Sequence, residues 1–128
     1  MTTTTRLRAA CLLAAVTTVT GLAGCGASGD TKAACTKVQN EIAQFNAGSM
    51  KNINDPAAMK TDYDNFAARI RADAKGTDIE AEAGAVATSF EKLAQQVADF
   101  SANPSTTMPN LNSADVIAAG TALKKKCT

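Results

Sequence analysis

The chain of 128 residues contains no histidine and no tryptophan, and aromatic residues make up only 4% of it. The absence of histidine removes the commonest general base and the commonest transition-metal ligand, and it excludes Ser-His-Asp and Cys-His catalytic arrangements. Hydrophobic residues reach 45%, and alanine supplies much of that share. An alanine-rich apolar content with few aromatics favours closely packed helices over a sheet core.

Strong charge of either sign is also lacking, because 13 basic residues stand against 12 acidic ones. A formal net charge of +1 is not the balance of a nucleic-acid-binding protein, so we expect no nucleic-acid partner. No glycine-rich phosphate loop is present, and the acidic residues are scattered instead of being paired around a cleft. We therefore expect neither catalysis nor a cofactor.

The first 24 residues have the pattern of an export signal. Arg6 and Arg8 lie in a basic start without acids, and the apolar stretch 9–24 follows it. A retained membrane-spanning helix is the alternative. However, this run of about 16 residues includes three threonines and two glycines, whereas a span needs about 20 strongly apolar residues. We therefore expect residues 1–24 to be a signal peptide that is removed.

The signal ends with the sequence LAGC, in which Leu22, Ala23 and Gly24 precede Cys25. This segment resembles the lipobox of bacterial lipoproteins, and the alanine- and threonine-rich style resembles small exported lipoproteins of the actinobacterial type. The resemblance stops at about residue 25. It implies that Cys25 receives a diacylglycerol and that the signal is cleaved between Gly24 and Cys25. Two acyl chains hold a protein stably on a membrane, here the outer face of the cell membrane.

Removal of the signal divides the remaining chain into two parts. Residues 25–29 form the lipidated cysteine and a short tether, and residues 30–128 form one helical domain. Because Arg6 and Arg8 leave with the signal, 11 basic residues remain against 12 acidic ones, which gives a formal net charge of −1.

Four segments of the domain carry apolar residues at steps of three and four, which is the spacing of one helix face. The first begins at Asp30 and fades at Gly48. The second begins with Asp55 as N-cap and Pro56 in the first turn, and Gly76 is placed to end it.

The third segment starts at Thr77, which forms a capping-box pattern with Glu80, and Asn112 or Ser113 caps the fourth. A heptad pattern as regular as that of the third segment can also pair with another chain, but three further amphipathic segments favour an internal partner. We predict an all-α, up-down-up-down four-helix bundle. The predicted core faces are Ala34, Cys35, Val38, Ile42 and Phe45; Met59, Tyr63, Phe66 and Ile70; Ile79, Ala83, Val86, Phe90, Leu93, Val97 and Phe100; and Val116, Gly120, Leu123 and Cys127, with Ile117 beside them.

Two cysteines remain for a crosslink, because Cys11 lies in the signal and Cys25 carries the lipid. Cys35 lies near the start of the first helix and Cys127 near the end of the fourth, and an up-down-up-down bundle brings these positions to the same end. A metal site or two reactive thiols are alternatives, but no histidine is present to complete a tetrahedral zinc set. In an exported protein this even pair predicts a Cys35–Cys127 disulfide.

The short tether predicts how the bundle is oriented. The disulfide end should face the membrane, and the loops at 47–54 and 101–112 should lie at the far end. Lys124, Lys125 and Lys126 then lie near the membrane, where contact with anionic lipid head groups is one interpretation. A solvated cap that interacts favourably with the helix C-terminus is the other, and we favour it.

No metal site is expected from the acidic clusters. The clusters Asp78-Glu80-Glu82 and Asp62-Asp64 place carboxylates two positions apart, so on a helix they point in different directions. The second cluster also lacks the glycine and the distal glutamate of a calcium loop.

The far loops hold four apolar residues, Met50, Ile53, Met108 and Leu111. They are either a contact site or, as we expect, residues that fold down and close the end of the bundle. We predict a non-catalytic interaction or accessory protein of the cell envelope, with these loops as the surface for an envelope protein. A small-ligand carrier with an apolar cavity between helices is the alternative, and the alanine-rich core argues mildly against such a cavity.

Overall fold

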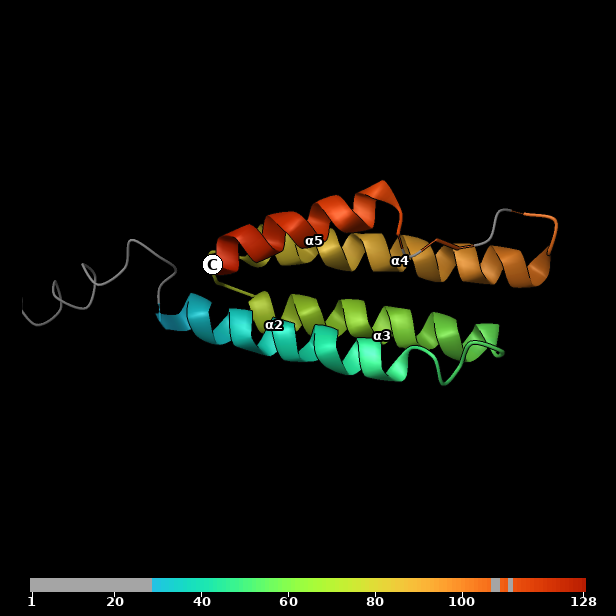
Figure 1. The fold of residues 1–128 in the computed structure, drawn as a ribbon, viewed down its shortest axis with the longest axis horizontal. Helices are drawn as coiled ribbons and strands as arrows, with labels where there is room; N and C mark the ends of the chain where they lie inside the picture. The colour runs from blue at the N-terminus through green and yellow to red at the C-terminus, as the bar shows by residue number, and fades with distance from the viewer. Residues whose placement is uncertain (1–28, 107–108, 111) are drawn as a thin grey trace, which may run out of the picture.

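The computed structural model describes residues 29–106, 109–110 and 112–128, and within these ranges it contains helices and no strand (Figure 1). The chain runs alternately up and down along one axis, so the prediction of an all-α four-helix bundle is confirmed. The four helices are α2 (Gly29–Gly48), α3 (Pro56–Ala74), α4 (Glu80–Ala102) and α5 (Ala114–Cys127).

Local signals set the ends of α3 and the start of α5. The Asp55 carboxylate accepts a hydrogen bond from the backbone N–H of Ala58 at 3.0 Å, and Pro56 occupies the first turn. Beyond the end of α3, Gly76 has a φ of 74°, a left-handed conformation that favours glycine. At α5 the cap is Ser113, whose hydroxyl accepts from the N–H of Val116 at 3.4 Å.

The capping box predicted at Thr77 and Glu80 is wrong. Helix α4 has Ile79 at its N-cap, with no side-chain cap. The Thr77 hydroxyl instead donates to the carbonyl of Ala74 at 2.7 Å, so it serves the end of α3. The Glu80 carboxylate accepts from the N–H of Gly76 at 2.8 Å. Because only a short turn separates the two helices, these side chains stabilise the turn and not the first turn of α4.

The core is built around α3 and α4, which make the most extensive contact in the molecule, while α2 packs on α3 and α5 packs on α4. Small residues explain this close approach. Ala67 and Ala74 of α3 and Ala83 and Ala87 of α4 are fully buried, and alanine side chains let two helix backbones come near each other.

A disulfide joins Cys35 at the start of α2 to Cys127 at the end of α5, with 5.6 Å between their Cα atoms. The predicted pairing is therefore confirmed, and both helix ends lie at one end of the bundle (Figure 1). We call this the disulfide end and the opposite end the distal end. The loop 49–55 and residues 103–106, which follow α4, lie toward the distal end.

Helix α5 is held less firmly than the other three. Leu123 is its one buried residue, while Val116, Ala119 and Cys127 are partly buried against the core. The predicted core face of α5 is therefore only partly correct, because Gly120 and Ile117 are exposed, Ile117 to 56%. With the slight contact between α2 and α5, this leaves space between those two helices away from the disulfide.

Candidate functional site

The loop between α2 and α3 exposes apolar side chains at the distal end. Met50 is 71% exposed and Ile53 is 53% exposed, so the expectation that they fold down over the end of the bundle is wrong. The loop turns back on itself and binds α3, where the Asn52 amide donates to the Asp62 carboxylate at 2.7 Å. Because its polar contacts hold it against α3, it does not cover the bundle end.

Four aromatic rings form the core at the distal half of the bundle. Phe45 of α2 has its ring centroid 4.5 Å from that of Phe66 of α3 and 5.1 Å from that of Phe90 of α4. Tyr63 joins them at 5.5 Å from Phe45 and 5.9 Å from Phe90. The tilted and edge-on arrangements are those that aromatic pairs prefer. These rings separate two hollows in the surface.

The first hollow, which we call the α2–α5 hollow, lies between those helices and measures about 370 Å³. Its floor includes Phe45, Phe66 and Phe90, which are each no more than 9% exposed. Among the described residues, none that lines it carries a charge. These lining residues are Ile42, Phe45, Asn46, Ser49, Phe66, Val86, Phe90, Asn112, Val116 and Gly120.

The second hollow, which we call the distal hollow, measures about 280 Å³ and lies between the 49–55 loop and the facing ends of α3 and α4. Most of its lining is apolar, and the part of the chain that the structure describes places no charged side chain in it. Ser49 lines both hollows, so they adjoin at the end of α2. The full lining is Ser49, Met50, Ile53, Pro56, Met59, Tyr63, Val97, Phe100 and Pro109.

Tyr63 supplies a hydroxyl group to the distal hollow. Its side chain belongs to the core, as predicted, and is 5% exposed. Among the described residues its hydroxyl has no hydrogen-bond partner. Burial raises the pKa of the phenol, and the nearby negative charge of Asp62 raises it further. The phenol is therefore neutral at physiological pH and offers a hydrogen-bond donor.

The two hollows explain which predicted core residues remain partly exposed. Ile42, Val116 and Gly120 belong to predicted core faces, and all three line the α2–α5 hollow. Met59 and Phe100 also belong to predicted faces, and both line the distal hollow. Apolar residues at helical spacing therefore also line surfaces that no other helix covers.

The polar rim of the α2–α5 hollow has no sequence signature. Asn46 and Asn112 are exposed and Ser49 is half-buried, so they lie at the mouth of the hollow, above the buried rings. Isolated amide and hydroxyl residues near helix ends are common, and no motif distinguishes these three. Only the packing of α2 beside α5 brings them together.

The three lysines at the end of α5 lie at the disulfide end of the bundle. Lys124, Lys125 and Lys126 are exposed. The Lys126 ammonium lies 3.7 Å from the Glu82 carboxylate of α4. Lys126 is 52% exposed and Glu82 is 22% exposed, so solvent screens this contact only in part. All three also lie in the last turn, where positive charge interacts favourably with the helix C-terminus.

The acidic residues of the two sequence clusters have separate partners. Asp78 accepts from the Thr31 hydroxyl at 3.2 Å, and Asp62 accepts from Asn52. Asp64 binds Lys60 at 2.6 Å, one turn away on the same helix. Within the described parts of the chain, no three histidine, cysteine, aspartate or glutamate side chains come together as a metal site would require.

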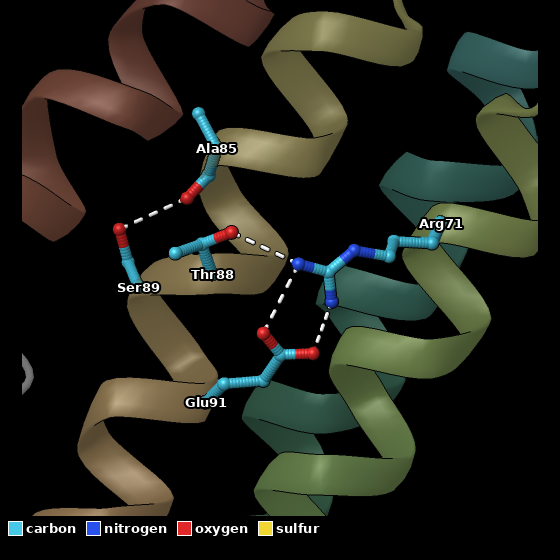
Figure 2. A network of polar contacts seen from close by, with 5 residues as sticks. All are labelled: Arg71, Ala85, Thr88, Ser89 and Glu91. Atoms are coloured by element: carbon cyan, nitrogen blue, oxygen red, sulfur yellow. Dashed lines mark hydrogen bonds and ion pairs between the residues drawn. The ribbon is translucent and has the colours of Figure 1, made fainter.

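A network of polar side chains crosses from α3 to α4 at the surface (Figure 2). The Arg71 guanidinium binds both carboxylate oxygens of Glu91, and it donates to the Thr88 hydroxyl at 2.9 Å. Beside it, the Ser89 hydroxyl donates to the carbonyl of Ala85 at 3.0 Å. The two charged side chains are 40% and 45% exposed, so the network orients the helices and adds little stability.

Several predicted features lie outside the described residues. These are the signal peptide, the lipobox with its cleavage site between Gly24 and Cys25, and the loop residues Met108 and Leu111. Of the helices that the structure describes, none combines the length and the hydropathy needed to span a bilayer.

Comparison of the chain with protein-family models, with curated proteins and with solved structures finds no match.

Proposed function

We propose that the protein is a lipoprotein anchored on the outer face of the cell membrane through Cys25, and that it acts without catalysis as an interaction or accessory protein of the cell envelope. The LAGC segment and the basic and apolar residues before it support the anchor. A tether of a few residues places the disulfide end toward the membrane and the distal end away from it.

The exposure of Met50 and Ile53 is the observation that carries this function. Both side chains lie on a loop at the distal end, where the proposed anchor leaves them accessible, and they border the uncharged distal hollow. Water-exposed methionine and isoleucine beside an apolar hollow are typical of surfaces that bind a partner. We therefore expect the envelope partner to bind this loop.

Replacing both Met50 and Ile53 with serine is expected to reduce capture of the envelope partner about tenfold, because central apolar contacts contribute most of the affinity of an interface. The measurement is affinity capture of the full-length protein from solubilised membranes, with quantitative mass spectrometry. Ile117→Ser is the matched control, because Ile117 is similarly exposed but lines neither hollow. Equal capture by wild type and the double variant would contradict the proposal.

Cys25→Ser is expected to abolish incorporation of radiolabelled palmitate and to leave the signal uncleaved, because the thiol is the acceptor of the lipid. Metabolic labelling followed by electrophoresis measures both effects. The control is Cys11→Ser, which removes a cysteine within the apolar run and should leave labelling unchanged. Persistent labelling of the Cys25 variant would show that the anchor is elsewhere.

A small-ligand carrier is the second candidate, and the two hollows favour it. Their volumes of about 370 and 280 Å³ are at the lower end of the range of small-molecule sites, and they adjoin at Ser49. The alanine-rich core does not close these hollows. Alanines bring α3 and α4 together, whereas the larger hollow lies between α2 and α5.

A further inference from the structure

We propose that the α2–α5 hollow binds the acyl chain of a lipid with an uncharged head group, such as a monoacylglycerol. This inference rests on the carrier function given above as the second candidate, and it names the ligand class of that site.

The width of the hollow selects a slender occupant. Phe66 and Phe90 form part of the floor, yet they are only 1% and 9% exposed, so little of each ring is open from above. A helix with its side chains is about 10–12 Å across and needs a broad exposed floor. A single hydrocarbon chain is much thinner than a helix and needs only a narrow strip of apolar floor. The shape therefore favours an acyl chain over a partner helix.

The charge of the lining selects an uncharged head group. Within the ranges that the structure describes, no lysine, arginine, aspartate or glutamate lines the hollow, and its polar groups are the rim residues Asn46, Ser49 and Asn112. Amides and a hydroxyl suit the ester and hydroxyl groups of an acylglycerol. A fatty-acid carboxylate at this position would lose hydration without gaining a cation.

The adjoining distal hollow extends the apolar surface. Because Ser49 lines both hollows, the second begins next to the first, and Met50 and Met59 line it. Unbranched methionine side chains adapt to an irregular apolar occupant. The Tyr63 hydroxyl, which has no partner in the described part of the chain, offers a donor at that end. The two hollows together suit a long, flexible molecule.

Gly120 provides a way to fill the hollow without disturbing the fold. It lines the hollow, and a Cβ added there meets no atom within 4 Å. Gly120→Leu therefore places a side chain in open space and improves helix propensity. Gly84→Leu is the matched control, because Gly84 also lies in a helix with no atom within 4 Å of an added Cβ. Gly84 lines a polar hollow beside Arg71 and Glu80 instead.

The test uses cells that make the full-length protein and receive a monoacylglycerol with a photoreactive diazirine in its acyl chain. After irradiation, we expect label on peptides from 42–49 and 112–120. We expect about tenfold less label in Gly120→Leu, because displacing two buried methylenes costs about that factor, and unchanged label in Gly84→Leu. A free fatty acid carrying the same diazirine should label less than the acylglycerol. Thermal melting by circular dichroism checks that both variants fold.

Any of three labelling results would overturn the inference: label spread evenly over the surface, equal label in Gly120→Leu and wild type, or stronger label from the free fatty acid. A photoreactive benzoylphenylalanine at Ile42 identifies the occupant directly. An adduct of lipid mass supports the inference, and an adduct with a polypeptide overturns it.

Partner capture is measured in the same variants. Capture retained without acyl labelling refutes this inference alone, while acyl labelling without a captured partner refutes the interaction function and leaves the carrier function standing.

Discussion

Replacing Cys35 and Cys127 with alanine is expected to lower the free energy of unfolding by about 4–5 kcal/mol. The disulfide closes a loop with a sequence separation of 92, and so long a loop greatly restricts the unfolded chain. A domain of about 100 residues has a total stability of about 5–15 kcal/mol, so the loss removes a large part of it. Urea unfolding followed by circular dichroism measures the shift.

Helix α5 should respond first to loss of the disulfide. Leu123 is its one buried residue, so α5 depends on the crosslink more than the other helices do. Hydrogen exchange in the double variant should be faster in 114–127 than in α3 or α4. Reducing agent provides the control, because it should shift the unfolding midpoint of wild type and leave that of the double variant unchanged. An unchanged wild-type midpoint, with two free thiols shown by mass spectrometry, would refute the prediction.

Phe66→Ala is expected to cost about 3–5 kcal/mol of stability, the second largest effect of a substitution proposed for this protein. The Phe66 ring is 1% exposed and lies 4.5 and 4.6 Å, between centroids, from Phe45 and Phe90. Its removal leaves a cavity in the one aromatic cluster of a chain with few aromatics. It also deepens the α2–α5 hollow, of which Phe66 forms part of the floor.

Phe100→Ala is the comparison for this effect, measured by the same urea unfolding. Phe100 is half-buried and forms none of the ring pairs found among the described residues. Its truncation should cost less than about 2 kcal/mol, because part of its ring is already exposed to water and it borders a hollow instead of the ring cluster. Similar losses for the two variants would show that the ring cluster has no special role in stability.

The helices and their order could be predicted because the determinants are local. Asp55 and Gly76 bound α3 through interactions within a few residues, and such contacts are readable from sequence. The face of α4 from Ile79 to Val97 is buried as predicted because α4 has neighbours on two sides. The Thr77 prediction failed, although its pattern was correct, because the end of α3 competes for the same hydroxyl.

The hollows could not be predicted from the sequence. The spacing of apolar residues shows which way a helix face points, but it does not show how close the neighbouring helix lies. Ile42 and Val116 point toward the same region, as their spacing predicts, but the gap between them depends on how α5 is placed. That placement is set at one end by the disulfide, and Gly120 has no side chain to fill the space. The exposure of Met50 likewise depends on the hydrogen bond between Asn52 and Asp62, which are separated by 10 positions in the sequence.

The disulfide also determines how the domain carries mechanical load. A force that pulls the chain at Gly29 and Thr128 enters α2, crosses from Cys35 to Cys127, and leaves at the last residue. The stretch between the two cysteines lies outside this path, so α3 and α4 bear no tension. A force applied between these two points would therefore extend only residues 29–34 of α2, and the rest of the bundle would keep its shape.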